Sequence, residues 1–207
     1  MLDFSKLKQP FKRASSDAPI EPELPPLEQL FQDVQARIHQ EIYHISIEPK
    51  RGPSCRLEDL QLHYGRHYGL LSLHQEMAEK LDLLEPEYDT LDLRQQMTYV
   101  EQYLDYVKAM VDCSYELIHF KEALAQAGAA IIKLDQDMHQ THSKDEFKSL
   151  EAGLEQILDL QDQLSRQYED FVFRGLDPIT ISSDYQAYLK KINSLQDALD
   201  ETRNWLG

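Results

Sequence analysis

Apolar residues recur along most of the chain at steps of three and four, the period of a helix with one buried face. The first such stretch follows Pro26, a residue that suits an opening helical turn because no backbone N–H is needed there. It ends at a predicted loop, 48–54. A second predicted helix runs from about Arg56 to Leu84, and Pro86 ends it. The stripes predicted for these helices are Leu27, Phe31, Val34, Ile38, Ile42 and Ile45, then Leu57, Leu60, Tyr64, His67, Leu71, His74, Ala78 and Leu81.

A third predicted helix, from about 91 to 142, carries two overlapping apolar stripes. The first runs from Leu93 to Ile118, and the second runs from Tyr103 to Met138. Two stripes predict two buried faces, so this helix is expected to be central, with the second helix on its first half and the fourth on its second half. Unbroken, about 50 residues would extend about 75 Å. Gly128 is the predicted weak point if the helix bends.

Two more helices are predicted after it. Ser143 with Glu146 forms a capping box, and a heptad-spaced stripe follows from Leu150 to Phe171. A second capping box is predicted to begin the fifth helix at Ser183. The predicted fold is all-α, an antiparallel helical bundle of about five helices with a long central helix and coiled-coil-like seams. In outline the pattern resembles spectrin-like and other coiled-coil bundles, without a motif that identifies one family.

Residues 1–25 form a different region, predicted to be a basic and then Pro-rich flexible leader before one acidic domain over 26–207. Within residues 1–13, apolar side chains alternate with cations. This pattern predicts a short segment that binds a protein partner or docks weakly and peripherally on a membrane. The residues concerned are Leu2, Phe4, Leu7 and Phe11 with Lys6, Lys8, Lys12 and Arg13.

Charge narrows the function classes. The chain has 21 Lys+Arg against 37 Asp+Glu, a formal charge of −16, which opposes binding to duplex nucleic acid. Residues 1–13 carry +3, so the other residues carry −19. The two cysteines, Cys55 and Cys113, are too few for a disulfide framework. With no apolar run of membrane-spanning or signal-peptide length, the predicted location is cytoplasmic.

The segment His63 to Gly69 contains a tandem His-Tyr-Gly motif. His63 and His67 are one helical turn apart, a spacing found in helical metal sites, so a metal- or haem-binding enzyme or sensor is one alternative function. The structural alternative, which the stripe favours, places His67 and His74 partly buried on it and His63 at the edge of solvent. No metal or other cofactor is predicted.

Gly65 and Gly69 lie one turn apart in the same segment, and each is unfavourable within a helix. A tight helix crossing is the first explanation, and a ligand or partner that approaches the backbone is the second. Tyrosines gather on the third helix, where packing and a partner face both explain them because one end of the ring is apolar and the other is polar. They are Tyr99, Tyr103, Tyr106 and Tyr115.

The chain lacks a glycine-rich phosphate loop, a GxSxG motif and an HExxH motif. The predicted function is therefore a non-enzymatic intracellular adaptor or scaffold. Its predicted partner is another protein or a second copy of itself, bound through exposed helical seams and the segment 1–13. The metal- or haem-binding protein and the peripheral membrane protein are the alternatives.

Overall fold

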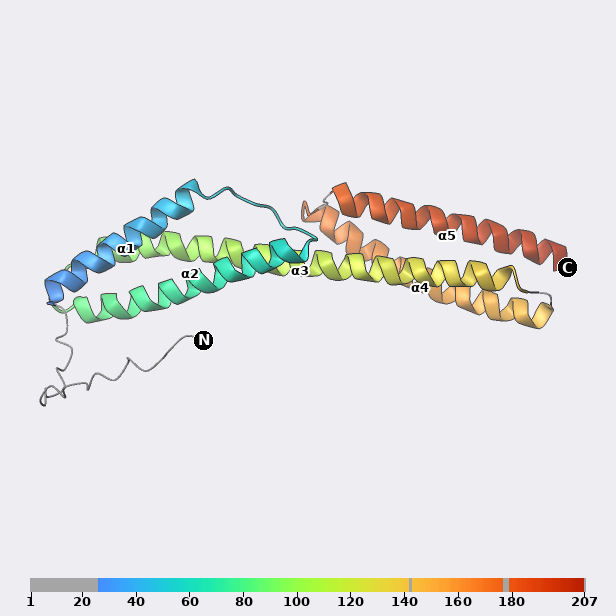
Figure 1. Ribbon diagram of the computed structural model, residues 1–207, viewed down its shortest axis with the longest axis horizontal. Helices are drawn as coiled ribbons and strands as arrows, with labels where there is room; N and C mark the ends of the chain where they lie inside the picture. Colours follow the sequence, from blue (N-terminus) through green and yellow to red (C-terminus); the bar gives the residue numbers. More distant parts are fainter. Residues whose placement is uncertain (1–25, 142, 177–178, 207) are drawn as a thin grey trace, which may run out of the picture.

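The computed structural model describes residues 26–141, 143–176 and 179–206. Within these residues all regular structure is helical, as the apolar pattern predicts, and there is no strand. The described elements confirm an all-α protein with five helices (Figure 1). They are α1 (Leu27–Ile47), α2 (Leu57–Leu84), α3 (Leu91–Met138), α4 (Lys144–Phe173) and α5 (Ile179–Leu206).

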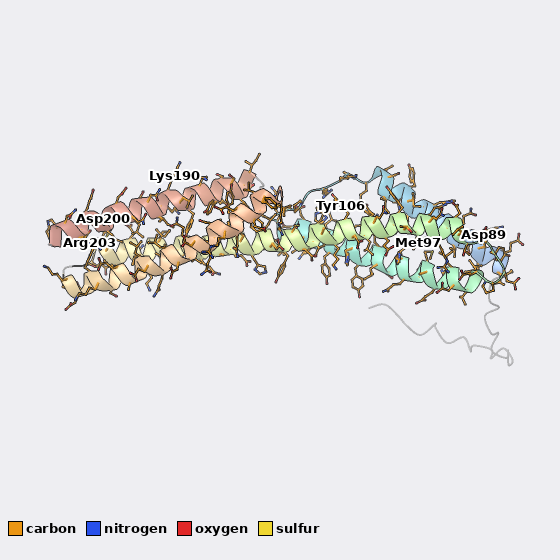
Figure 2. The ribbon with its side chains drawn as sticks, turned by 180° about the vertical axis from the view of Figure 1, so that it is seen from behind. Asp89, Met97, Tyr106, Lys190, Asp200 and Arg203 are labelled. Atoms are coloured by element: carbon orange, nitrogen blue, oxygen red, sulfur yellow. The ribbon has the colours of Figure 1, made fainter. Side chains whose placement is uncertain are left out.

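The helix α3 is the axis of the molecule. It continues without a break through Gly128 for 48 residues, about 72 Å. Helices α1 and α2 pack against its first half and α4 and α5 pack against its second half, so the molecule is an elongated rod (Figure 1). In Figure 2, Asp89 marks one end of this rod and Arg203 lies near the other. The predicted packing of the second and fourth helices is confirmed.

The two apolar stripes of α3 serve two separate cores. The change from one to the other falls between Val107 and Leu117. The structure has two cores, and α3 contributes to both of them. The prediction that 26–207 is one domain therefore stays a prediction. The first core contains Val34, Ile38, Ile45, Leu70, Leu73, Met77, Leu81, Leu84, Leu93, Met97, Val100, Leu104 and Val107. The second contains Leu117, Phe120, Leu124, Ala127, Ile131, Leu134, Met138, Phe147, Leu150, Ile157, Leu164, Phe171, Ile181, Tyr185, Tyr188, Ile192, Leu195 and Leu199.

The connection between α1 and α2 returns along the rod to the middle of α3. The backbone N–H of Ser54 donates a hydrogen bond to the Ser114 hydroxyl, with 3.0 Å between the two atoms. The Tyr106 hydroxyl donates to the Arg51 carbonyl oxygen at 2.8 Å. Cys55 packs against the second core. This loop therefore joins the first three-helix bundle to the point where the second begins.

The stripe predicted for α2 is correct only in part: Leu81 is buried and His67 and His74 are partly buried, as predicted. Leu57 and Tyr64 are exposed, and His63, predicted at the edge of solvent, is buried. Leucines occur around most of this helix, so apolar spacing alone allows more than one buried face. The observed face contains larger aliphatic side chains in its second half than the predicted one. Its members are His63, Leu70, Leu73, Met77, Leu81 and Leu84.

The ends of α4 follow the sequence signals, whereas the start of α5 does not. The Ser143 capping box is present, with its hydroxyl accepting from the Glu146 N–H. Gly175 has a positive φ of 69°, which glycine adopts easily, and closes α4. The capping box predicted at Ser183 is wrong, because α5 begins at Ile179 and Ser183 lies inside it. The second core already includes Ile181, so the apolar stripe starts before the predicted cap.

Candidate functional site

A partly buried cluster of charges joins α1 to α2 inside the first bundle. The Arg66 guanidinium lies 2.8 Å from a carboxylate oxygen of Glu41 and 2.8 Å from one of Glu48. Glu41 is 8% exposed and lies on the buried face of α1. The Arg66 guanidinium also lies over the Tyr103 ring, 5.8 Å from its centroid. This cluster fixes the end of α1 against α2 and α3.

The pKa values in the cluster reflect its burial. Burial alone would lower the pKa of Arg66, but Glu41 and Glu48 outweigh it and the pKa is raised. Burial, together with the nearby carboxylate of Glu48, raises the pKa of Tyr103 to about 12. Arg66 is therefore charged and Tyr103 is neutral at physiological pH.

A cavity of ≈ 460 Å³ adjoins this cluster, between the α1–α2 loop and the helices α2 and α3. His63, 9% exposed, lines it together with Arg66, Tyr103 and Tyr106. His67 is only partly buried and does not line this cavity. Among the described residues no group of three or more His, Cys, Asp and Glu side chains is placed to hold a metal ion. The metal or haem site at His63 and His67 stays an untested alternative.

The exposed side of α2 carries no charge, unlike the Arg66 cluster. Eight residues of this helix between positions 61 and 75 are exposed, and none of them is charged, in a protein of which 28% of the residues are charged. On α4, by comparison, six of the ten exposed residues between positions 152 and 170 are charged. We call the eight residues the uncharged α2 face: Gln61, Leu62, Tyr64, Gly65, Tyr68, Gly69, Ser72 and Gln75.

At 100° per residue these eight positions fall within about 160° of one another, so they form one continuous surface. Tyr64 is 58% exposed and Tyr68 is 66% exposed, high values for rings of this size. Arg66 lies within the same stretch of sequence, but it is only partly exposed and pairs with Glu41 and Glu48. The face is therefore rich in aromatic surface and free of ionised groups.

The two glycines of this face do not mark a helix crossing within the described part of the chain. A Cβ at Gly65 or at Gly69 would meet nothing within 4 Å, so the expected tight crossing is wrong there. The second explanation, a ligand or partner that approaches the backbone, stays a prediction. The close approach lies instead at Gly153 on α4, where a Cβ would be 2.9 Å from the Cδ1 atom of Leu134. A single glycine amid a heptad pattern gave little reason to expect this contact.

A hollow of ≈ 550 Å³ borders one end of the uncharged α2 face. Tyr64 and Gly65 line it from α2, and Val111 and Tyr115 line it from α3. Tyr115 is exposed, and its ring packs edge to face against that of His119 with centroids 4.2 Å apart. The exposed Asp112 of α3 also lines this hollow, so the surface there combines apolar and aromatic side chains with one carboxylate.

The tyrosines predicted to gather on α3 take different positions. Tyr103 and Tyr106 stack on each other beside the Arg66 cluster, with centroids 5.6 Å apart. Tyr99, one turn before Tyr103, is exposed. Tyr115 faces the hollow next to α2. The cluster thus divides into a packed pair and two exposed rings.

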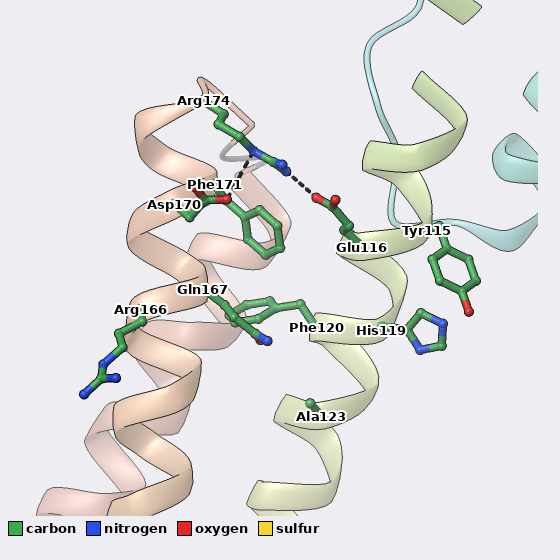
Figure 3. A pocket seen from close by; sticks show the side chains of 10 residues that line it. All are labelled: Tyr115, Glu116, His119, Phe120, Ala123, Arg166, Gln167, Asp170, Phe171 and Arg174. Carbon is green, nitrogen blue, oxygen red and sulfur yellow. Dashed lines mark hydrogen bonds and ion pairs between the residues drawn. The ribbon is translucent and has the colours of Figure 1, made fainter. Parts of the chain in front are cut away.

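The largest described hollow, ≈ 680 Å³, lies between α3 and α4 (Figure 3). Arg174 crosses its upper part, paired with Glu116 on α3 and with Asp170 on α4. Figure 3 shows the Phe171 and Phe120 rings below this pair and Arg166 pointing away from α3. The ion pair between Arg174 and Glu116 already crosses this groove, so we regard it as part of the scaffold.

The cysteines have different surroundings. Burial raises the pKa of the Cys113 thiol, and this favours the unreactive protonated form. Cys55 is partly buried against the second core. The segment of residues 1–13, with its predicted apolar and basic contacts, lies outside the described residues.

Comparisons with known proteins found no match to any family model, to any curated protein or to any solved structure. In the part of the chain that the structure describes, none of the helices combines the length and apolarity that crossing a membrane requires.

Proposed function

We propose that the protein is a non-enzymatic adaptor or scaffold that binds another protein through the uncharged α2 face, and that it acts in the cytoplasm. The observation that carries this proposal is the absence of charge from all eight exposed residues of α2 between positions 61 and 75. An exposed helix needs no such absence for stability or solubility. A surface that must lose its water on binding benefits from it, because desolvating ionised groups is costly.

The residue types on this face suit a protein partner. Tyr64 and Tyr68 offer large, rigid rings that combine apolar contact with a hydrogen-bonding hydroxyl. Gly65 and Gly69 leave open space beside the rings, where a partner side chain fits against the backbone. The Arg66 cluster and the first core hold α2 in place beneath this surface, and a fixed scaffold lowers the entropy lost on binding.

Charges around the face favour a particular kind of partner. Carboxylates flank it at both ends, Glu58 and Asp59 before it and Glu76 and Glu79 after it. A partner with an apolar centre and basic flanks complements this arrangement. Two copies of this chain paired through the same face would bring carboxylates together at both ends, whether α2 helices run parallel or antiparallel. We therefore propose a different protein as the main partner.

A capture experiment with a matched control tests the proposal. Three chains are immobilised and incubated with lysate of the source cell. They are the full chain, the α2 variant Tyr64→Lys with Tyr68→Lys, and the control Gln156→Lys with Gln163→Lys on the exposed side of α4. Both variants add the same charge at exposed positions. We expect a protein that the parent chain and the control retain and that the α2 variant loses. Identical retention by all three chains would contradict the proposal.

A further inference from the structure

We propose that residues 1–13 of this same chain dock on the uncharged α2 face and compete there with the protein partner. The inference rests on the proposed function for its choice of face. It adds an internal occupant of stated sequence, with the apolar residues Leu2, Phe4, Leu7 and Phe11 and the cations Lys6, Lys8, Lys12 and Arg13.

The geometry of the first bundle brings the start of α1 close to the end of α2. Phe31, in the second turn of α1, stacks on Tyr88 with ring centroids 4.9 Å apart, and Tyr88 follows directly after α2. From the end of α2, the near end of the uncharged face at Gln75 is about 14 Å away and the far end at Gln61 is about 35 Å away. Residues 14–25 span at most about 40 Å when extended. The chain is therefore long enough for residues 1–13 to lie along the whole face.

The charges favour one orientation of residues 1–13 along α2, with Arg13 nearest the end of that helix. Residues 76–94, at the end of the rod where α1 begins, contain seven carboxylates, one lysine and one arginine. Lys80 pairs with Glu76, and Arg94 pairs with Asp82 and Glu85, so this end keeps a net charge of −5. Lys12 and Arg13 are the members of residues 1–13 closest in sequence to the linker, so they reach this acidic end first. The positive segment and this negative end attract each other through opposite charge.

The apolar residues then meet the surface that lacks charge. With Lys12 and Arg13 placed near Glu76 and Glu79, the preceding residues run toward Tyr68 and Tyr64. At the far end lies the hollow of ≈ 550 Å³ lined by Tyr64, Gly65 and Tyr115, which has room for an apolar side chain. The apolar residues of the segment thus find a matching surface, and Asp112, which also lines the hollow, offers a carboxylate to Lys6 and Lys8, the cations that lie between them.

Docking within one chain changes how the protein binds its partner. A linker of about 12 residues gives the tethered segment an effective concentration in the millimolar range, so modest contacts suffice for occupancy. A partner must then displace residues 1–13, and the segment acts as an autoinhibitory contact.

Photo-crosslinking of the full chain tests this inference. Leu7 is replaced by the photoreactive analogue benzoylphenylalanine, and the chain is irradiated at low concentration, alone and in buffer. We expect a product of monomer mass in which residues 1–13 are linked to the 61–75 stretch of α2. Adding Tyr64→Lys and Tyr68→Lys should lower the yield about tenfold, a change of about 1.4 kcal/mol. Adding Gln156→Lys and Gln163→Lys should leave the yield unchanged.

Three outcomes would overturn the inference: no crosslink, crosslinks mainly to α4 or α5, or crosslinks only between two chains. The result is separable from that of the lysate capture. A partner lost from the α2 variant, without the internal crosslink, would leave the proposed function standing and remove only the docking of residues 1–13. An internal crosslink on α2 without any captured partner would support the docking and contradict the proposed function.

Discussion

The two halves of the rod place their polar groups in opposite ways. The first half, built by α1, α2 and the start of α3, buries charge in the Arg66–Glu41 pair and leaves an exposed helix face without any. The second half has an apolar core with stacked and edge-to-face aromatic rings around Phe120, and six of ten exposed residues on one stretch of α4 are charged.

We propose that this difference separates a binding half from a supporting half. Both halves have an apolar core, and in the first half the Arg66–Glu41 pair adds a directional contact between α1 and α2. The Arg66 cluster thus orients α2 against α1 and α3. The uncharged face on the other side of α2 then has a fixed position relative to the rest of the molecule.

The largest expected effect lies in the supporting half. Phe120 is buried and contacts Tyr168, Phe171 and Tyr185. Phe120→Ala should lower the free energy of unfolding by about 3–5 kcal/mol, through lost burial and the cavity left behind. Urea denaturation followed by circular dichroism measures this. A loss below about 1 kcal/mol would show that the aromatic cluster is not a tightly packed core.

The next largest effect is the loss of stability when one arginine in each half is replaced by alanine. Arg66→Ala leaves the buried Glu41 without its partner and should cost about 2–4 kcal/mol. Arg174→Ala in the second half removes ion pairs with the exposed Glu116 and Asp170 and a cation–π contact with the Phe171 ring, and should cost about 1 kcal/mol. Denaturation of the two variants side by side provides the measurement. Equal losses would remove the distinction between the halves.

A double replacement tests whether the unpaired charge of Glu41 causes the loss of stability in Arg66→Ala. Arg66→Met together with Glu41→Leu removes both charges and keeps apolar bulk, so most of the stability lost in Arg66→Ala should return. We expect this double variant to unfold nearer to the parent chain than to the single variant. If it is no more stable than Arg66→Ala, lost packing rather than an unpaired buried charge explains the single variant.

Alkaline pH should also affect the first half through Tyr103. Its pKa is raised from 10.0 to about 12 in the folded chain, so above pH 10 the unfolded chain ionises first. The stability contributed by keeping this phenol neutral is complete below pH 10 and is lost as the pH rises toward 12. Unfolding free energies measured across this range should fall less steeply for Tyr103→Phe than for the parent. Equal slopes would mean that burial of this hydroxyl has no effect on stability.

The smallest expected effects come from two glycines. Gly65→Ala meets open space and should stabilise α2 by about 0.5–1 kcal/mol. Gly153→Ala places a methyl 2.9 Å from Leu134 and should give a net loss of about 1 kcal/mol. Thermal unfolding of both variants distinguishes them. A destabilised Gly65→Ala would reveal a close contact at this face that the described residues do not show.

The apolar pattern predicted the buried faces where apolar residues are confined to those faces. On α3 the aliphatic residues follow two clear stripes, and these predict the central helix and the packing of α2 and α4. They leave open whether this helix bends at Gly128. On α2, where Leu70, Leu71 and Leu73 point in different directions, the apolar pattern could not identify the buried face. The interpretation of Gly65 and Gly69 as a crossing failed for the same reason.

The candidate site was only partly predictable. The Tyr- and Gly-containing segment was recognisable as unusual, and the tertiary structure was needed to show that its exposed residues form one uncharged surface. The pair Glu41 and Arg66 joins positions 25 residues apart on different helices, and no spacing rule connects them. Sequence pattern reports which residues share a helix face, but it does not report which neighbour covers that face.

The central claim, that α2 carries the interaction surface, is tested most directly by crosslinking inside the source cell. Benzoylphenylalanine is placed at Tyr68 on the uncharged α2 face in one full-length chain and at Gln163 on α4 in another. The account predicts a discrete product heavier than the chain from the Tyr68 position and none from the Gln163 position. A heavier product from the α4 position alone, or the same products from both, would contradict it.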